Sequence, residues 1–180
     1  MWRLIFRMLC ILLLTGLAAS SPAQQPPRTR PQDVASIDAI ITASYAAISH
    51  PAEKPADLQR FQSLFQSGAQ LFNLSDQNGK PAMRAGAIEQ ITKMLQSTQH
   101  PERAHFEKEI ARRTERFGNV AHVWSTYQST DTEQKRKTYV RGINSISLVY
   151  DSGRWWIVSA QWTNETKVRP IPPQYLQAKE

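Results

Sequence analysis

Residues 141–162 decide the fold, and they run Arg141-Gly-Ile-Asn-Ser-Ile-Ser-Leu-Val-Tyr150, Asp151-Ser-Gly153 and Arg154-Trp-Trp-Ile-Val-Ser-Ala-Gln-Trp162. The first arm alternates apolar and small polar residues with the two-residue period of a strand that has one buried face. The second arm holds three of the five Trp of the chain. With a turn sequence between them, the two arms predict an antiparallel β-hairpin.

The length of the hairpin loop decides which residues face the core. Asp151-Ser-Gly153 favours a three-residue loop closed by a glycine in the left-handed region, and this loop places Leu148 opposite Trp156. A two-residue loop instead places Trp155 and Ile157 on the core face, because a shift of one residue moves every side chain of an arm to the other face. We expect the three-residue loop.

The length and composition predict one globular domain. The chain has 180 residues, of which 41% are hydrophobic, and this is enough to bury a single core. The formal charge is +7, but the basic residues are dispersed among acidic ones. Together with the export signal described next, this charge pattern predicts no nucleic-acid partner.

Residues 1–23 are typical of a secretory signal peptide. Arg3 and Arg7 precede an apolar run at 8–19, and Ser21-Pro-Ala23 supplies small residues for cleavage. A retained membrane anchor is the alternative, although the run is shorter than the roughly 20 residues of a spanning helix. We therefore expect a periplasmic or secreted bacterial protein with a flexible leader at 24–32 and no membrane attachment after cleavage.

Cysteine and histidine usage exclude several kinds of site. Cys10 is the single cysteine and lies in the predicted signal, so the mature chain has no disulfide, thiol nucleophile or thiolate ligand. Removing Arg3 and Arg7 lowers the formal charge from +7 to +5. No two histidines have metal-motif spacing, and the sequence contains no glycine-rich phosphate loop or nucleophile elbow. The sequence thus predicts no metal and no cofactor.

Helical patterns fill the first half of the domain. Asp33 is placed to cap a helix that ends before Pro51, and a second helix is broken at Gly68. Apolar residues recur at three- and four-residue steps in both. In chain order these patterns predict a helix at 33–49, a helix at 55–67, a short strand at 69–74, a polar turn at 75–79 and a helix at about 86–96.

Extended patterns fill the second half. We expect strands at 104–116 and 120–130 around a two-residue turn at Gly118-Asn119, and a polar loop at 128–136. The even loop places Phe106 on the core face and Glu107 and Glu109 on a charged outer face. Helices followed by hairpins predict an α+β domain at 33–167, with three N-terminal helices packed into a curved, mostly antiparallel sheet. The proline-rich tail at 168–180 is predicted to lie extended along it.

The order of these elements resembles the nuclear transport factor two-like superfamily, and its SnoaL-like branch in particular. The resemblance depends on the first helix with Tyr45, the second helix ending at Leu64-Phe65, the step at Gly68-Ala69 into a strand, and the hairpin from Leu148 to Trp162. It implies a cone in which the sheet wraps around the first helix and opens at one end into a pocket, often in a dimer formed through the sheet.

The isomerases of this superfamily use three groups, and the resemblance locates their positions here. A tyrosine in the first helix and an acid in a late strand hold an oxyanion, and an early-strand aspartate is the base. Tyr45 matches the tyrosine, the base falls at or beside Asn73, and the acid falls at Asn144 or Ser145. Because an amide cannot take up a proton at neutral pH, this departure argues against isomerase chemistry.

Three functions remain open. The first is non-catalytic binding of a small apolar molecule; the second is a dimeric interaction module that uses the outer sheet face; the third is a dehydratase, cyclase or isomerase that uses Tyr45 with an acid or base still to be located. Asn73 and Asn144 either bond each other across a dry cone or present donors to a ligand. The predicted ligand-binding residues are Tyr45, Leu71, Asn73, Asn144, Ile146 and Trp162.

The final hairpin carries apolar residues on both faces, so a partner surface is expected. A monomer rarely exposes a contiguous apolar patch of more than a few hundred Å². We expect a homodimer through the outer sheet face, with Trp124 and the outward Trp of the Trp155-Trp156 pair near its centre. The alternative is that the tail folds back over this face and covers it with Ile171, Tyr175 and Leu176.

Overall fold

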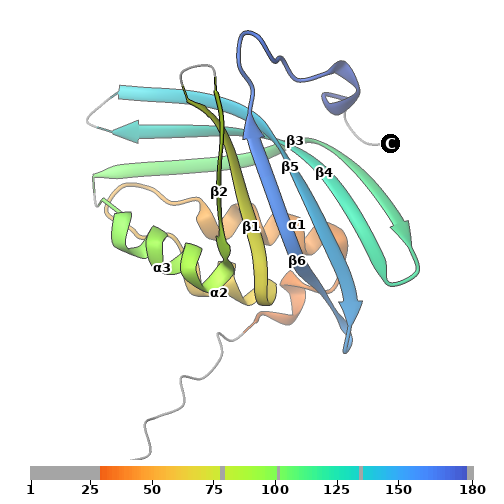
Figure 1. Ribbon diagram of the computed structural model, residues 1–180. Helices are drawn as coiled ribbons and strands as arrows, with labels where there is room; N and C mark the ends of the chain where they lie inside the picture. The colour runs from red at the N-terminus through yellow and green to blue at the C-terminus, as the bar shows by residue number, and fades with distance from the viewer. Residues whose placement is uncertain (1–28, 78–79, 101, 134–135, 178–180) are drawn as a thin grey trace, which may run out of the picture.

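The computed structural model describes residues 29–77, 80–100, 102–133 and 136–177. The predicted signal peptide and the leader as far as residue 28 lie outside these ranges. Within them, no helix combines the length and the hydropathy needed to cross a membrane. Figure 1 shows a strongly curved sheet with the helices gathered on one side of it.

The first helix begins later than the sequence predicted. Residues Pro31–Asp33 form a short 3-10 helix, and α1 spans Ile37–Ile48. Ser36 caps α1, because its side chain accepts a hydrogen bond from the Ala39 N–H at 3.0 Å. Asp33, the predicted cap, is buried and receives two hydrogen bonds from Arg60 at 2.7 and 2.9 Å.

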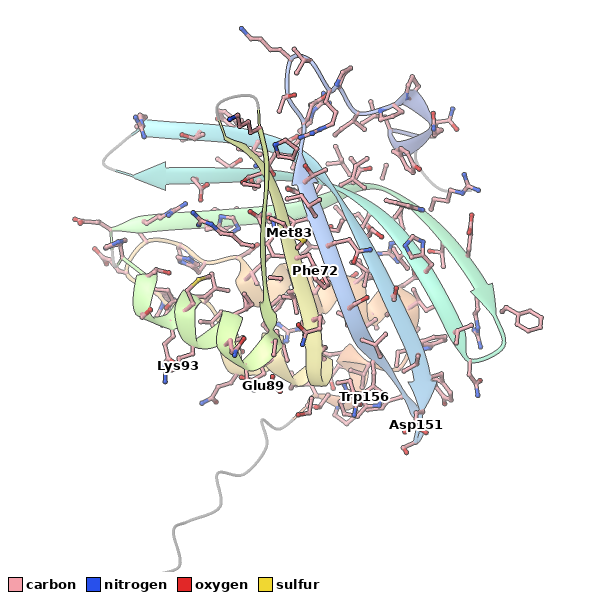
Figure 2. The ribbon with its side chains drawn as sticks, viewed as in Figure 1. Phe72, Met83, Glu89, Lys93, Asp151 and Trp156 are labelled. Carbon is pink, nitrogen blue, oxygen red and sulfur yellow. The ribbon has the colours of Figure 1, made fainter. Side chains whose placement is uncertain are left out.

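The other two helices lie beside α1 and β1 (Figure 1). Helix α2 spans Leu58–Ser63 and is capped by Asp57, whose carboxylate accepts the Arg60 N–H at 3.0 Å. Helix α3 spans Ile88–Thr98. Figure 2 shows Glu89 in its first turn, where the carboxylate accepts the backbone N–H of Gly68 at 3.1 Å. This contact fastens the start of α3 to the first strand.

In the ranges given above, six strands form one sheet in the order β2-β1-β6-β5-β4-β3. Only the pairing of β1 with β6 is parallel, which confirms the predicted α+β domain with a mostly antiparallel sheet. Two expectations were wrong: residues 80–87 form a strand before the third helix, and the predicted loop at 128–136 is mostly strand. The strands are β1 Phe65–Gln77, β2 Lys80–Ala87, β3 Arg103–Phe117, β4 Val120–Glu133, β5 Arg136–Asp151 and β6 Arg154–Asn164.

The hairpin of β5 and β6 has the two-residue loop, so the preferred register was wrong. Asp151 pairs with Arg154, and Leu148 pairs with Ile157. Both loop residues have positive φ, 50° at Ser152 and 81° at Gly153, as in the type I′ turn that matches the twist of the strands. Trp155 and Ile157 are therefore buried, at 3% and 1% exposure. Figure 2 shows Trp156 close to this turn.

A β-bulge in β3 reverses the faces expected for its first half. The turn at Gly118-Asn119 has two residues as predicted, but the register shifts between Glu109, which pairs with Tyr127, and Ala111, which pairs with Thr126. The extra residue leaves Glu107 and Glu109 on the helix-facing side with Ser129 and Tyr127. Phe106, predicted to be in the core, is instead 50% exposed.

The core lies between the helices and the inner face of the sheet. Its fully buried side chains include Ile40 and Ile41 of α1, Leu148 of β5 and Ile157 of β6. The outer face is covered at one place by the tail: the Tyr175 ring lies 5.4 Å from that of Trp124, and the Thr126 hydroxyl donates to the Tyr175 carbonyl at 2.5 Å. Phe72 and Met83 lie on the outer face of β1 and β2 (Figure 2).

Candidate functional site

The six predicted ligand-binding residues share the inner face but differ in burial. Tyr45, Leu71 and Ile146 are buried at 6%, 3% and 5% exposure. Asn73, Trp162 and Asn144 are half-buried and form one cross-strand row, because Asn73 of β1 and Asn144 of β5 both pair with Trp162 of β6. Trp162 thus separates the two asparagines, which do not bond each other.

The Tyr45 hydroxyl joins helix α1 to the sheet. It accepts a hydrogen bond from the Asn144 amide at 3.0 Å and lies 2.7 Å from the Ser125 hydroxyl. Ser125 donates its proton to Glu109 at 2.6 Å, so it must accept the proton of Tyr45. Asn144, Tyr45, Ser125 and Glu109 therefore form a chain of hydrogen bonds that all run towards one carboxylate.

An ion pair holds the Glu109 carboxylate at the end of this chain. Arg112 donates to both Glu109 oxygens, at 2.6 and 2.5 Å. Residues three apart on a regular strand point to opposite faces, so this pair depends on the bulge between them. Arg112 also binds Asp38, at the first turn of α1. The Glu109 charge is thus compensated and is not a free base.

Burial keeps both inner tyrosines in the neutral form. Burial raises the pKa of the Tyr45 phenol well above its usual value, and the hydrogen bonds that Tyr45 makes with Ser125 and Asn144 offset this in part. Burial also raises the pKa of Tyr127, helped by the nearby Glu107 charge. Because its one proton is already donated to Ser125, Tyr45 has none to offer to an oxyanion.

A second polar cluster lies where β3 and β4 run beyond α1. The His105 imidazole Nδ1 is 2.8 Å from the Asp131 carboxylate, and its Nε2 is 3.6 Å from Glu107. The pKa of His105 is raised because Glu107, and after it Asp131, favour the protonated ring. Nearby, the Tyr127 hydroxyl donates to the Asn164 side chain at 2.6 Å.

Sequence reasoning missed the inner carboxylates. It assigned Glu107 and Glu109 to the outer face by counting from the turn, and the count fails at Ile110 because a bulge has no reliable local signature. It also left the late-strand position at Asn144 or Ser145. Asn144 faces Tyr45, whereas the Ser145 hydroxyl lies on the outer face, 2.9 Å from the His122 Nε2.

An open cavity of about 670 Å³ lies beyond the end of β6. None of the six predicted residues lines it. In the ranges that the structure describes, no group of three or more acidic, histidine or cysteine side chains is arranged to hold a metal ion. The cavity is lined by Leu74, Ser75, Gln128, Tyr139, Val140, Arg141, Asn164, Glu165, Thr166 and Arg169.

Comparison with known proteins gives structural likenesses only. No family model and no curated protein matches the sequence. A putative calcium/calmodulin-dependent protein kinase II association domain from Xanthomonas campestris is 15% identical, with a TM-score of 0.55 over 73% of this chain and 86% of that one. A protein from Catenulispora acidiphila in complex with S-DNPA is 11% identical, with a TM-score of 0.55 over 71% and 90%.

A nuclear transport factor two-like protein of unknown function from Shewanella baltica is 18% identical, with a TM-score of 0.46 over 71% of this chain and 92% of that one. At these identities the likenesses concern the fold and not the activity. The narrower SnoaL-like assignment stays a prediction. The structure and the likenesses with a TM-score above 0.5 agree on the fold: three helices packed against a six-stranded, mostly antiparallel sheet, consistent with a nuclear transport factor two-like cone.

Proposed function

We propose that the domain binds a small, mostly apolar molecule at the row of Asn73, Trp162 and Asn144, and releases it unchanged. The observation that carries this is the row itself: three half-buried side chains with polar groups on adjacent strands, next to the row in which buried Leu71 and Ile146 both pair with Ala160. Ligand sites of this kind combine apolar walls with a few convergent polar groups.

Unused hydrogen-bonding capacity supports the proposal. Among the described residues, neither the Asn73 amide nor the Trp162 indole N–H takes part in a hydrogen bond, and neither is among the fully enclosed unpaired atoms. Asn144 donates one amide N–H to Tyr45, and its amide oxygen is still available as an acceptor. These three residues together offer donors and acceptors to a molecule that lies on the row.

The inner groups that are linked to Asn144 by hydrogen bonds are already engaged, which argues for binding over catalysis. Glu109 is paired with Arg112, and the Tyr45 proton is committed to Ser125. The solved structure of one neighbour, the Catenulispora acidiphila protein, is in complex with S-DNPA, and a small-molecule ligand on the same fold is consistent with the proposal.

The test is ligand-observed NMR with a mixture of an aromatic alcohol, a steroid and a medium-chain alcohol. We expect binding by the full chain and about tenfold weaker binding by Asn73→Leu and Asn144→Leu, each of which loses roughly one hydrogen bond of 1–1.5 kcal/mol. Gln96→Leu, an exposed amide on α3, is the matched control. Equal binding by all four proteins would contradict the proposal, and recovery of altered compounds would favour an enzyme.

We also propose that the domain works outside the cytoplasm of a bacterium. The support is the signal-like sequence at 1–23 and the lack of cysteine after it. Intact mass of exported protein should give a mature chain that begins near Gln24. Retention of residues 1–23 on the exported or membrane-bound protein would contradict a cleaved signal.

A further inference from the structure

The sheet has a gap beyond the end of β6. Strand β6 lies between β1 and β5, and its last pairs are Thr163 with Leu74 and Asn164 with Gly142. Beyond these pairs β1 continues through residues 75–77 with β2 as its pairing partner, and β5 begins at residues 136–141 with β4 as its partner. The chain itself leaves the sheet after β6 (Figure 1).

The gap lies between the two strands that β6 separates, β1 and β5. Two strands that flank a third lie roughly 9.5 Å apart, twice the spacing between neighbours in a sheet. The 670 Å³ cavity occupies this place and is lined from both sides, by Leu74 and Ser75 of β1 and by Tyr139 and Val140 of β5. The cavity is therefore bounded by two strand edges that β6 no longer fills.

Backbone groups of β5 face into the gap. The Arg141 carbonyl accepts the Glu165 N–H at 2.8 Å, so the backbone groups of residue 141 point to the β6 side. In a regular antiparallel strand alternate residues point to the same side, and β5 pairs with β4 without a shift here. Tyr139 and Lys137 thus direct N–H and C=O groups into the gap, where a second strand would satisfy them.

A positive charge lies at the closed end of the gap. Thr166 and Arg169 form a bridge that turns the chain away, and Arg169 donates to the Thr163 hydroxyl and the Asn164 carbonyl at 3.2 and 3.4 Å. Both acceptors are neutral. Arg141, the other arginine of the cavity, is paired with Glu165. In the described ranges Arg169 has no carboxylate partner, so its charge is available to an anion.

We propose that this gap binds the C-terminal end of an extended peptide, with its main-chain carboxylate at Arg169. Such a peptide would run opposite to β6, antiparallel to β1 and parallel to β5, and its N–H and C=O groups would pair with Tyr139 and Lys137. Leu74, Tyr139 and Val140 would contact its alternate side chains. The inference is independent of ligand binding at the Asn73, Trp162 and Asn144 row.

The experiment uses the full chain immobilised with two pools of random heptapeptides, one ending in a free carboxylate and one in an amide. We expect enrichment of free-carboxylate peptides, and at least a tenfold loss of enrichment with the amidated pool or with Arg169→Gln. Lys167→Gln, which removes a charge from the same loop outside the cavity lining, is the matched control and should bind as the unchanged chain does.

A pair of variants at one position isolates the backbone contact. Tyr139→Ala removes the side chain alone, whereas Tyr139→Pro also removes the N–H that faces the gap and leaves the bonds to β4 in place. We expect the proline variant to bind the enriched peptides at least tenfold more weakly than the alanine variant, with circular dichroism confirming that both fold.

Three results would overturn the proposal: no enrichment of either pool, enrichment that ignores both amidation and Arg169→Gln, or equal binding by the Ala and Pro variants. Displacement of the peptides by hexanoate at concentrations that saturate Arg169 would support the anion contact. Binding of hexanoate without any peptide binding would instead assign the cavity to small acids.

Discussion

Asp33 was expected to cap the first helix, but it is buried and forms an ion pair with Arg60. The guanidinium lowers the pKa of Asp33 through its hydrogen bonds, against the opposing effect of burial. The two side chains are 20% and 8% exposed, whereas those of the Arg30 and Asp57 pair are 52% and 47% exposed. The two Arg–Asp ion pairs therefore have the same chemistry but differ in how far they are buried.

Replacing Arg60 by Gln should lower the free energy of unfolding by about 2 kcal/mol, because the Asp33 charge stays in a poorly solvated place. Arg30→Gln should change it by roughly 0.5 kcal/mol or less, as is usual for exposed ion pairs. Urea unfolding at pH 7 measures both. Equal losses of unfolding free energy for Arg60→Gln and Arg30→Gln would contradict the expected effect of burial.

His105 should make stability depend on pH. Its folded pKa is raised by Glu107 and Asp131, so the protonated ring stabilises the fold below the ordinary histidine pKa of about 6.5, and this contribution is lost as the pH rises through the folded pKa. We expect the chain to lose stability between pH 6 and pH 9 relative to His105→Gln.

Urea unfolding across that range, with an NMR titration of the His105 ring, checks the expectation. The exposed His100 provides the control, since His100→Gln should keep the pH dependence of the unchanged chain. A His105→Gln profile parallel to that of the unchanged chain would contradict the assignment.

At this scale the sequence predicted one contact of the site and missed another. Tyr45 and Asn144 were expected to converge, and the resemblance to a known fold placed them at matching positions. Glu109 was not expected there, because the side that a strand residue faces depends on every residue between it and the turn. A single bulge is enough to move the side chains of the residues before it to the other face of the sheet.

At the scale of elements, the turn between β5 and β6 places a serine where a positive φ is required. Ser152 has φ of 50°, a left-handed conformation that costs serine more than it costs glycine, which has no Cβ, or asparagine, whose side chain can hydrogen-bond locally. Asn-Gly is the preferred pair for a type I′ turn.

Ser152→Asn should therefore raise the free energy of unfolding by roughly 0.5 kcal/mol. Ser97→Asn, at an exposed position near the end of α3, should bring no gain. Thermal unfolding of the two variants beside the unchanged chain gives the comparison. A loss of stability with Ser152→Asn would contradict the two-residue loop.

The missed strand β2 shows why local patterns failed in the first half. Its sequence, Lys80 to Ala87, contains Pro81 and Gly86 and mostly small side chains, which is a poor strand signal. It forms because the edge of β1 is available, and an edge strand tolerates proline. The pairing with β1, and not the strand propensity of residues 80–87, is what makes β2 a strand.

At the scale of the whole molecule, the tail lies on part of the face that was expected to form a dimer. Tyr175 packs against Trp124, which was placed near the centre of that interface. Ile171, also in the tail, is 7% exposed. These contacts support the alternative in which the tail is the cover, while a homodimer through the remaining sheet face stays a prediction.

Removing the tail after Lys167 should therefore promote association, because Trp124 and Thr126 lose their cover. Sedimentation velocity of the mature chain and of the shortened chain measures this, with a Tyr175→Ser variant to separate loss of the ring from loss of the segment. We expect a larger sedimentation coefficient for the shortened chain. A full-length dimer that is unchanged by the truncation would favour the sheet-mediated interface and contradict the tail as cover.

The bulge at Ile110 divides β3 into two halves, and the alternation of inward- and outward-facing residues shifts by one residue between them. Odd-numbered residues face the interior before it, as Glu107 and Glu109 do, and even-numbered residues such as Arg112 and Thr114 face it afterwards. One residue gained or lost between the bulge and the start of β3 would exchange an acidic interior for one that holds Phe106 and Lys108. Chains with this fold can thus change what they enclose through strand length alone, and an alignment that ignores strand parity will compare interior residues with exterior ones.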